Sequence, residues 1–190
     1  LVAIPNGNAY GSDRLYEYLP DGDTLGSFTG RASLYLQWML DNLAPTLDAN
    51  YRTLGGAADT FTAGSSMGGL VSDYIGFQRP DRFGGVGIFS PSYWAAPNFI
   101  NGRSLVWQSV RRWIYMGTAE SSASWQNALS AYNGYLRTGQ AVNRHLAFEG
   151  GAGGQHNEPN WSRRLPVFFA WMLAPWREAN LLALETIRSS

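Results

Sequence analysis

The chain has 190 residues, of which 45% are hydrophobic and 15% are charged, and its formal net charge is zero. This composition is typical of one globular domain, and no run of like charge suggests binding to nucleic acid or an anionic membrane. The chain contains no cysteine and no lysine, and it has 2 histidines. Thiol nucleophiles, disulfides, Schiff-base lysines and three-histidine metal sites are therefore excluded, and any catalysis must use the remaining polar side chains.

The first half of the chain alternates between strand and helix patterns. Leu1–Ile4 reads as a short apolar strand that ends in turn residues. Leucines at helical spacing predict a helix over Arg31–Leu47, despite Pro45. β-Branched and aromatic residues predict a strand over Asp59–Ala63, and the apolar positions that follow predict a helix that Pro80 ends.

The second half continues the alternation. Apolar runs bounded by turn residues predict three buried strands, Gly84–Ser90, Arg111–Gly117 and Val142–Gly150. Helical spacing of apolar residues predicts three helices, Trp125–Leu136, Trp161–Leu173 and Trp176–Arg188. Ser122 or Ser124 could cap the first of these helices. The pattern predicts a single α/β domain over residues 1–190, with a mostly parallel sheet and helices on both faces.

A candidate nucleophile lies between the strand and the helix of the first half. Gly64–Gly68 reads Gly-Ser-Ser-Met-Gly, which matches the pattern Gly-x-Ser-x-Gly with Ser66 in the central place. In a nucleophile elbow this sequence forms a tight turn that exposes the serine hydroxyl. The N–H of Met67, at the helix N-terminus, could then stabilise an oxyanion. The alternative is a turn serine, because so short a pattern also arises by chance in a chain rich in glycine and serine.

A serine nucleophile needs a base and an acid that orients it, and α/β-hydrolases supply them in the chain order serine, acid, histidine. Glu120 is the only acidic residue between Arg112 and Arg144, and it follows a predicted strand. His156 lies on a glycine-rich loop after the next strand, whereas His145 lies inside that strand and is expected to be a packed or surface histidine. Taken singly, Glu120 could be a helix N-terminal charge and His156 a loop residue. Their order and placement together favour a Ser66–His156–Glu120 triad.

Aromatic residues follow the strand that is expected to end at Ser90. Tyr93 and Trp94 come soon after it, on the side of a parallel sheet where ligands bind. They could form a wall for an acyl or aryl group, or they could pack in the core. Trp161 and Phe168 are expected to be core residues.

Several stretches together resemble the putative-esterase family of the α/β-hydrolase fold, which includes enterochelin-type, feruloyl and acetylxylan esterases, S-formylglutathione hydrolase and mycolyltransferases. The matching stretches extend to about Leu173 and are Arg14–Pro20, Ala49–Thr53, Ala63–Leu70, Arg79–Trp94, Tyr115–Glu120 and Gly153–Pro166. The resemblance implies Ser66 as nucleophile, Glu120 as acid and His156 as base, with no cofactor and no metal.

The chain departs from that family at its N-terminal end. In the family, the region like Arg14–Pro20 follows the fourth strand, so three strands and a loop with the second oxyanion donor would precede Leu1. The third of those strands would lie between Leu1–Ile4 and Asp59–Ala63. We therefore expect an N-terminal fragment or a second chain to complete the sheet. In a less favoured alternative, the first strand pairs directly with the nucleophile strand, and the loop Pro5–Gly11 supplies the missing donor.

The leading hypothesis from the sequence is a serine carboxylic-ester hydrolase that forms an acyl-enzyme on a small, siderophore-like, carbohydrate or aryl ester. Acyl transfer to an alcohol by the same triad is a second hypothesis. A hydrolase fold kept for binding, without catalysis, is a third. The sequence does not indicate a compartment.

Overall fold

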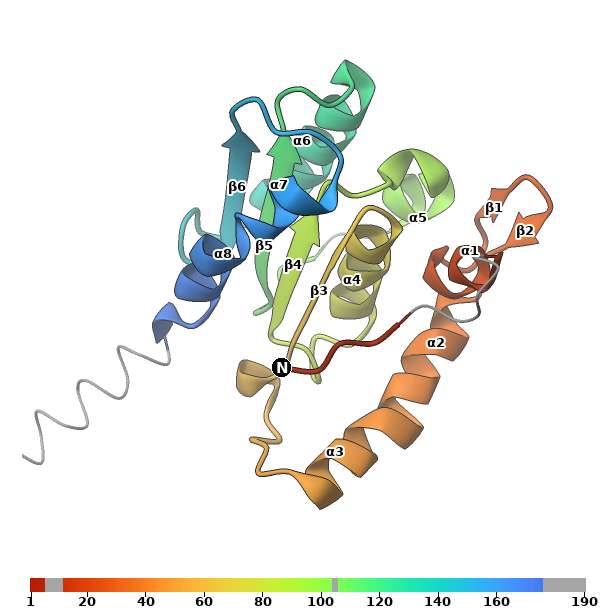
Figure 1. Cartoon of the computed structure of the whole chain (residues 1–190), viewed down its shortest axis with the longest axis vertical. Coiled ribbons are helices and arrows are strands. Elements are labelled where there is room, and N and C mark those ends of the chain that lie inside the picture. The colour runs from red at the N-terminus through yellow and green to blue at the C-terminus, as the bar shows by residue number, and fades with distance from the viewer. Residues whose placement is uncertain (6–11, 104–105, 176–190) are drawn as a thin grey trace, which may run out of the picture.

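A parallel sheet is the centre of the fold (Figure 1). The computed structural model describes residues 1–5, 12–103 and 106–175. Within them the main sheet has 4 strands in the order β3-β4-β5-β6. These strands are β3 (Phe61–Ser65), β4 (Gly85–Phe89), β5 (Arg111–Gly117) and β6 (Leu146–Gly151). Every neighbouring pair is parallel, so the carboxyl ends of all of them lie at one edge of the sheet.

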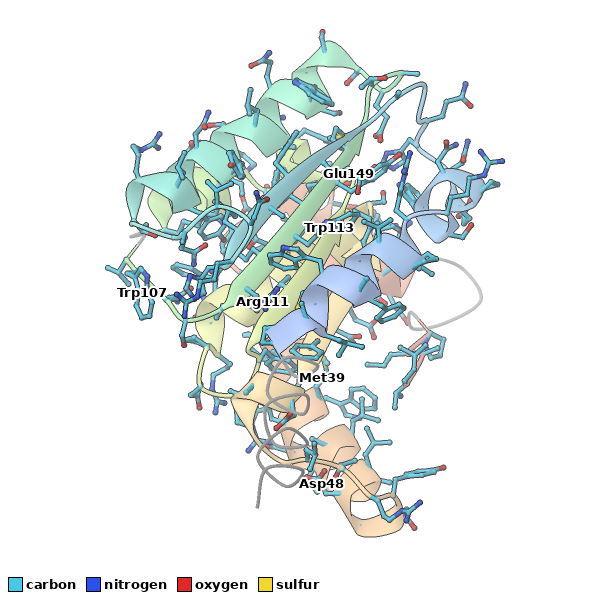
Figure 2. All side chains as sticks on the ribbon, turned by 90° about the vertical axis from the view of Figure 1, so that its left-hand side faces the viewer. Met39, Asp48, Trp107, Arg111, Trp113 and Glu149 are labelled. Atoms are coloured by element: carbon cyan, nitrogen blue, oxygen red, sulfur yellow. The ribbon has the colours of Figure 1, made fainter. Side chains whose placement is uncertain are left out.

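Helices cover both faces of this sheet (Figures 1 and 2). The helices α4 (Met67–Gln78) and α6 (Ser122–Arg137) pack on one face, and α8 (Leu165–Met172) packs on the other. The predicted α/β fold with a parallel sheet and helices on both faces is thus confirmed. No helix among the described residues is long and apolar enough to cross a membrane.

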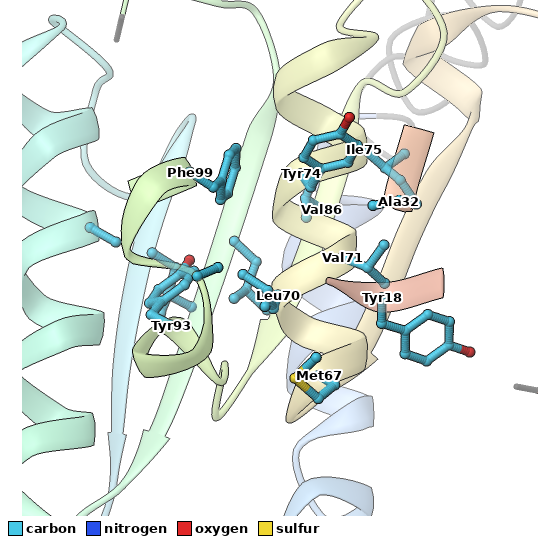
Figure 3. Packing of buried hydrophobic residues seen from close by; sticks show 14 of the residues in the cluster. Tyr18, Ala32, Met67, Leu70, Val71, Tyr74, Ile75, Val86, Tyr93 and Phe99 are labelled. Atoms are coloured by element: carbon cyan, nitrogen blue, oxygen red, sulfur yellow. The ribbon is translucent and has the colours of Figure 1, made fainter. Parts of the chain in front are cut away.

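Two hydrophobic cores follow from the alternation of side chains along the strands. Val86 and Ile88 point towards α4 and α6, where Leu70 and its neighbours pack around them (Figure 3). Trp113 points to the opposite face, where its ring lies 5.7 Å from that of Phe168 on α8 (Figure 2). The two central strands, β4 and β5, are therefore buried on both faces, as their continuous apolar sequence predicts.

The remaining elements lie before β3 or in the connections. They are α1 (Ser12–Tyr18), the hairpin strands β1 (Thr24–Leu25) and β2 (Phe28–Thr29), α2 (Ala32–Trp38), η1 (Met39–Leu43), α3 (Ala44–Asn50), η2 (Ala57–Asp59), η3 (Tyr93–Ala95), α5 (Pro97–Gly102) and α7 (Glu158–Ser162). The sequence pattern gave no prediction for α1, for the hairpin or for α5.

The predicted helix over Arg31–Leu47 is present and extends to Asn50, as α2, η1 and α3 in succession. The middle part, η1, is a π-helical turn that comes immediately before Pro45 in α3. Proline has no N–H to donate and its ring crowds the carbonyl four residues earlier. The wider turn of η1 accommodates this misfit, so Pro45 does not end the helix.

The predicted strand Leu1–Ile4 is wrong, because these residues belong to no strand. Among the described strands β3 pairs with β4 alone, so Leu1–Ile4 does not extend the sheet. Ile4 packs against the core, while the side chain of Leu1 is fully exposed. The alternative in which the first strand pairs with the nucleophile strand is therefore wrong as well. Most of the loop Pro5–Gly11 lies outside the described residues, and Pro5 itself has no N–H.

Smaller corrections concern the ends of elements. The strand expected from Val142 begins at Leu146, because Asn143 takes a left-handed conformation with φ of 61° and turns the chain. The cap of α6 is Ser121 rather than Ser122 or Ser124, and it accepts from the N–H of Ser124.

The predicted helix Trp161–Leu173 is two helices, α7 and α8. The first begins at Glu158, where Asn157 caps it. The predicted helix Trp176–Arg188 lies outside the described residues.

Candidate active site

Ser66 is held in a strained backbone conformation between β3 and α4. Its φ of 59° and ψ of −122° lie in a region that residues with a side chain rarely adopt. Its N–H donates to the carbonyl of Phe89 at 2.9 Å, which fixes the turn to the end of β4. Such strain persists only where the surrounding structure enforces it, and it is concentrated at functional sites.

Two glycines make this turn possible, and one of them differs from the expected pair. A Cβ on Gly64 would lie 2.5 Å from the carbonyl oxygen of Gly68. A Cβ on Gly69 would lie 2.9 Å from the carbonyl oxygen of Phe89. Gly68, in contrast, has nothing within 4 Å of an added Cβ. Close approach of the backbone therefore requires glycine at positions 64 and 69. It does not require glycine at position 68, the second glycine of the sequence pattern.

Three polar side chains meet at the carboxyl edge of the sheet. Nε2 of His156, on the loop after β6, lies 3.0 Å from Oγ of Ser66. Nδ1 of His156 lies 2.7 Å from Oε2 of Glu120, which follows β5. A carboxylate can only accept, so Nδ1–H of His156 donates to Glu120, and Nε2 without a proton is left to accept from the serine.

His145 is not part of this cluster. It lies in a turn before β6, and not inside the strand as expected, so it is at the opposite edge of the sheet. Its ring lies 6.3 Å from that of Trp107, and its side chain is half-buried.

The carboxylate of Glu120 is buried and fully hydrogen-bonded. Its side chain is 3% exposed, against 46% for that of His156. Oε1 accepts from Oγ of Ser90 at 2.6 Å and from the N–H of Gly117 at 3.0 Å. Burial alone would raise the pKa of Glu120, but the hydrogen bonds from His156, Ser90 and Gly117 outweigh it and hold the pKa below its usual range. Glu120 is therefore ionised at neutral pH.

Three residues that the sequence interpretation did not assign to the site also contact the cluster. Oγ of Ser92 lies 3.2 Å from Oγ of Ser66. Nε1 of Trp161 donates to Oγ of Ser90 at 2.9 Å, and its ring lies 5.0 Å from that of His156. The position of Ser90 and Ser92 just after β4, at the edge that carries Ser66, could have indicated them. Trp161 was expected in the core, and it does lie against the apolar face under α8.

Met67 is the first residue of α4 and directly follows Ser66. The first N–H groups of a helix have no carbonyl partner inside it, so this one is free to meet an anion beside the serine. The side chain of Met67 is turned away into the core and is 5% exposed.

Comparison with known proteins identifies the family of the chain. Residues 1–172 match the family model described as putative esterase. The chain belongs to the putative-esterase family. A stretch of 67 residues, which is 35% of the chain, is 36% identical to part of an endo-1,4-β-xylanase/feruloyl esterase of Xylanibacter ruminicola.

Solved structures of other esterases share the fold of this family member. The enterochelin esterase of Shigella flexneri superimposes with a TM-score of 0.70 at 18% identity and covers 87% of the chain. A ferulic acid esterase of Anaeromyces mucronatus superimposes with a TM-score of 0.54 at 25% identity and covers 67% of the chain. The chain spans 9% of the xylanase/feruloyl esterase, 40% of the enterochelin esterase and 49% of the ferulic acid esterase, less than half of each.

The two aromatic residues expected near the substrate have different surroundings in this putative-esterase chain. Tyr93 is 2% exposed, and its hydroxyl donates to Oδ2 of Asp73 at 2.8 Å inside the core (Figure 3). It therefore offers almost no surface to a ligand. Trp94 is 58% exposed and lies two residues after Ser92. Among the described residues no group of three or more His, Asp or Glu side chains could hold a metal ion.

Proposed function

We propose that this chain carries the catalytic centre of a serine carboxylic-ester hydrolase with Ser66, His156 and Glu120 as its triad. The observation that carries the proposal is the continuous hydrogen-bond chain from Oγ of Ser66 through His156 to Glu120, with links of 3.0 and 2.7 Å. Both links lie within the reach that proton transfer from a serine needs.

The reaction follows from the roles of these atoms. Oγ of Ser66 attacks the ester carbonyl while Nε2 of His156 takes its proton, and the ionised Glu120 stabilises the imidazolium. The N–H of Met67 donates to the oxyanion of the tetrahedral intermediate. His156 then returns the proton to the leaving alcohol, and an acyl-enzyme remains. Water activated by His156 attacks this ester, which releases the acid and restores Ser66.

The proposed substrate is an ester of an aromatic acid with a small alcohol or a carbohydrate. Two similarities support an aromatic acyl group. The stretch of 36% identity belongs to a xylanase/feruloyl esterase, and an enterobactin esterase of the same fold was solved with 2,3-dihydroxy-N-benzoyl-serine. The exposed indole of Trp94 is the side chain we assign to stacking on the acyl ring.

A fluorophosphonate probe tests the nucleophile directly. We expect it to label Ser66, as peptide mass mapping would show, and to leave Ser66→Ala unlabelled. Ser65→Ala is the matched control, because it removes the neighbouring hydroxyl at the end of β3 and should keep full labelling. Failure to label well-folded protein would contradict the proposal and favour a non-catalytic binding module.

An ester panel then tests the substrate class and the acceptor. We expect feruloyl and benzoyl esters to be hydrolysed faster than acetyl esters of the same alcohol. Trp94→Ala should raise KM for the aromatic esters and leave the acetyl esters unchanged. Products formed with added acceptor alcohols would reveal transfer to an alcohol in place of hydrolysis.

A further inference from the structure

A second series of hydrogen bonds reaches Glu120, the acid of the proposed triad, at the carboxylate oxygen that does not contact His156. Ser90 follows the last residue of β4, and it is 1% exposed. Its hydroxyl donates to Oε1 of Glu120 at 2.6 Å and accepts from Nε1 of Trp161 at 2.9 Å. The line therefore runs from Trp161 through Ser90 to Glu120 and His156.

The direction of each bond is fixed by chemistry. An indole Nε1–H can only donate, so it occupies a lone pair of Ser90. An ionised carboxylate can only accept, so the one hydroxyl proton of Ser90 must point at Glu120. With the N–H of Gly117 also on Oε1, that oxygen has two donors and Oε2 remains for His156. The carboxylate is thus locked in the rotation that His156 requires.

The backbone of Ser90 supports a functional interpretation. Its φ is 45°, and among the described non-glycine residues only Ser66 and Asn143 share a positive φ. Two of these three strained residues lie at the proposed site. The N–H of Ser90 donates to the carbonyl of Tyr115 at 2.8 Å, which holds the strained residue against β5. The hydroxyl of this strained residue is the one that donates to Glu120.

Trp161 also connects the loop of the base to the loop of the acid. It lies on α7, which begins two residues after His156 and is capped by Asn157. Its ring meets that of His156 edge to face at 84°, with 5.0 Å between centroids. One side chain therefore contacts the base and, through Ser90, the acid.

We propose that Ser90 and Trp161 are positioning residues of this esterase: Trp161 directs the hydroxyl of Ser90, and Ser90 holds the carboxylate of Glu120 for His156. The inference depends on the proposed function for its kinetic consequences. Of the groups that hydrogen-bond to Glu120, His156 is the one that becomes charged in the proposed reaction, while Ser90 and Gly117 are neutral donors.

The test compares Trp161→Phe, Ser90→Ala and the double variant. Trp161→Phe keeps an aromatic ring and removes the N–H, and we expect kcat on an aryl ester to fall about threefold to tenfold. Ser90→Ala removes a donor to a charged group, and we expect a fall of about tenfold or more. KM should stay within about twofold in each. Because Trp161 acts through Ser90, the double variant should lose little more than Ser90→Ala alone.

Trp171→Phe is the matched control. Nε1 of Trp171 donates to the carbonyl of Asn143 at 2.9 Å, the same length as the Trp161 bond, but near the opposite edge of the sheet. It should leave kcat unchanged. Ser90→Gly removes the hydroxyl and relieves the positive φ, so it should lose as much activity as Ser90→Ala. Recovery of activity in the glycine variant would mean that strain, and not the hydroxyl, matters, and would overturn the proposal.

Proton NMR provides a readout that does not need turnover. With 2 histidines in the chain, the imidazole signals can be separated and assigned with a His145→Gln variant. The Nδ1 proton that His156 donates to Glu120 gives a signal far downfield, and this signal should move upfield in Ser90→Ala, because a carboxylate without the Ser90 donor can rotate away from the imidazole. A signal in Ser90→Ala at the wild-type position would overturn the inference. An inactive wild type that still shows the shift would instead refute the esterase assignment alone.

Discussion

The hydroxyl oxygen of Ser92 lies 3.2 Å from that of Ser66, and the N–H of Ser92 donates to the carbonyl of Ser66 at 3.1 Å. The one hydroxyl proton of Ser66 is directed at Nε2 of His156, so Ser92 is the donor between the two hydroxyls. Ser92 therefore places its O–H on the oxygen that would carry negative charge during attack.

Replacement of Ser92 by alanine should slow the reaction of Ser66. The loss of one hydrogen bond worth about 1 kcal/mol corresponds to about fivefold slower labelling by a fluorophosphonate. Ser72→Ala is the control, because Ser72 is a buried serine on α4 whose hydroxyl lies 3.4 Å from that of Thr62, away from Ser66. Equal labelling rates in both variants and the wild type would show that the Ser92 hydroxyl is not used.

Replacement of Asp73 by asparagine should destabilise the fold strongly. Asp73 is fully buried and accepts from Arg103 at 2.8 Å and from Tyr93 and Tyr135, with Nε of Arg112 at 3.7 Å. The variant leaves two buried guanidinium groups without a counter-charge. We expect a loss of about 3–5 kcal/mol in the free energy of unfolding, measured by urea denaturation.

This loss should depend on pH in a defined direction. Burial alone would raise the pKa of Asp73, but the charges of Arg103 and Arg112 and the hydrogen bond from Tyr135 hold it below its usual range. A lowered folded-state pKa gives stability that is complete above the unfolded value of about 3.9 and is lost as the pH falls below it. The gap between wild type and Asp73→Asn should be constant from about pH 7 to 5 and narrow below about pH 4.

Asp81→Asn is the control for Asp73→Asn. Asp81 pairs with Arg79 at the same distance of 2.8 Å, but its side chain is 61% exposed. Solvent screens such a pair, so its removal should change the free energy of unfolding little. A similar loss in the two variants would show that burial is not what makes the Asp73 pair important.

Substitution of alanine at two glycines of the elbow should have opposite effects. Gly64→Ala would place a Cβ 2.5 Å from backbone, so the turn must open and both the melting temperature and labelling of Ser66 should fall. Gly68→Ala meets nothing within 4 Å and lies in the first turn of α4. Alanine is better than glycine in a helix by about 0.5–1 kcal/mol, so this variant should melt at a higher temperature. An equal fall in melting temperature in the two variants would contradict the conclusion that the close backbone contact is at Gly64.

The elements that sequence predicted correctly are those whose own residues determine them. The strands β4 and β5 are continuous apolar runs between turn residues, and α4 has apolar residues at helical spacing up to Pro80. The helix α5 shows why others were missed. Its N-cap position is Ala96, which cannot cap, and the carboxylate of Asp23 accepts from the N–H groups of Asn98 and Phe99 instead. A cap supplied from so far along the chain leaves no local signal.

The same distinction applies to the site. Ser66, Glu120 and His156 were predictable because their chain order and their placement after strands are visible in the sequence. The contacts of Ser90 with Glu120 and Trp161 join residues 30 and 71 positions apart and exist only once the strands are aligned. Tyr93 and Trp94 are adjacent in sequence, and only the fold buries one and exposes the other.

The outer edge of β3 leads to the last prediction. The carbonyl of Thr60 accepts from Gly84 and the N–H of Ser66 donates to Phe89, so the even-numbered residues of this segment face β4. The N–H and C=O groups of successive residues in a strand point to opposite edges of the strand. Those of Phe61, Ala63 and Ser65 therefore point away from β4, to the open edge of the sheet. Among the described residues no strand pairs with this edge. We propose that a strand from an N-terminal fragment or a second chain binds there.

Native mass spectrometry of protein purified without denaturant checks this proposal, and we expect a second polypeptide in the complex. Amide exchange gives the local counterpart. In the isolated chain the N–H groups of Ala63 and Ser65 should exchange faster than that of Gly64, because unpaired edge groups are open to solvent. Binding of the partner should protect Ala63 and Ser65 and leave Gly64 as it was. A lone chain with full activity and rapid exchange at Ala63 would contradict the need for a further strand, since an unpaired β3 would then suffice to hold Ser66 in place.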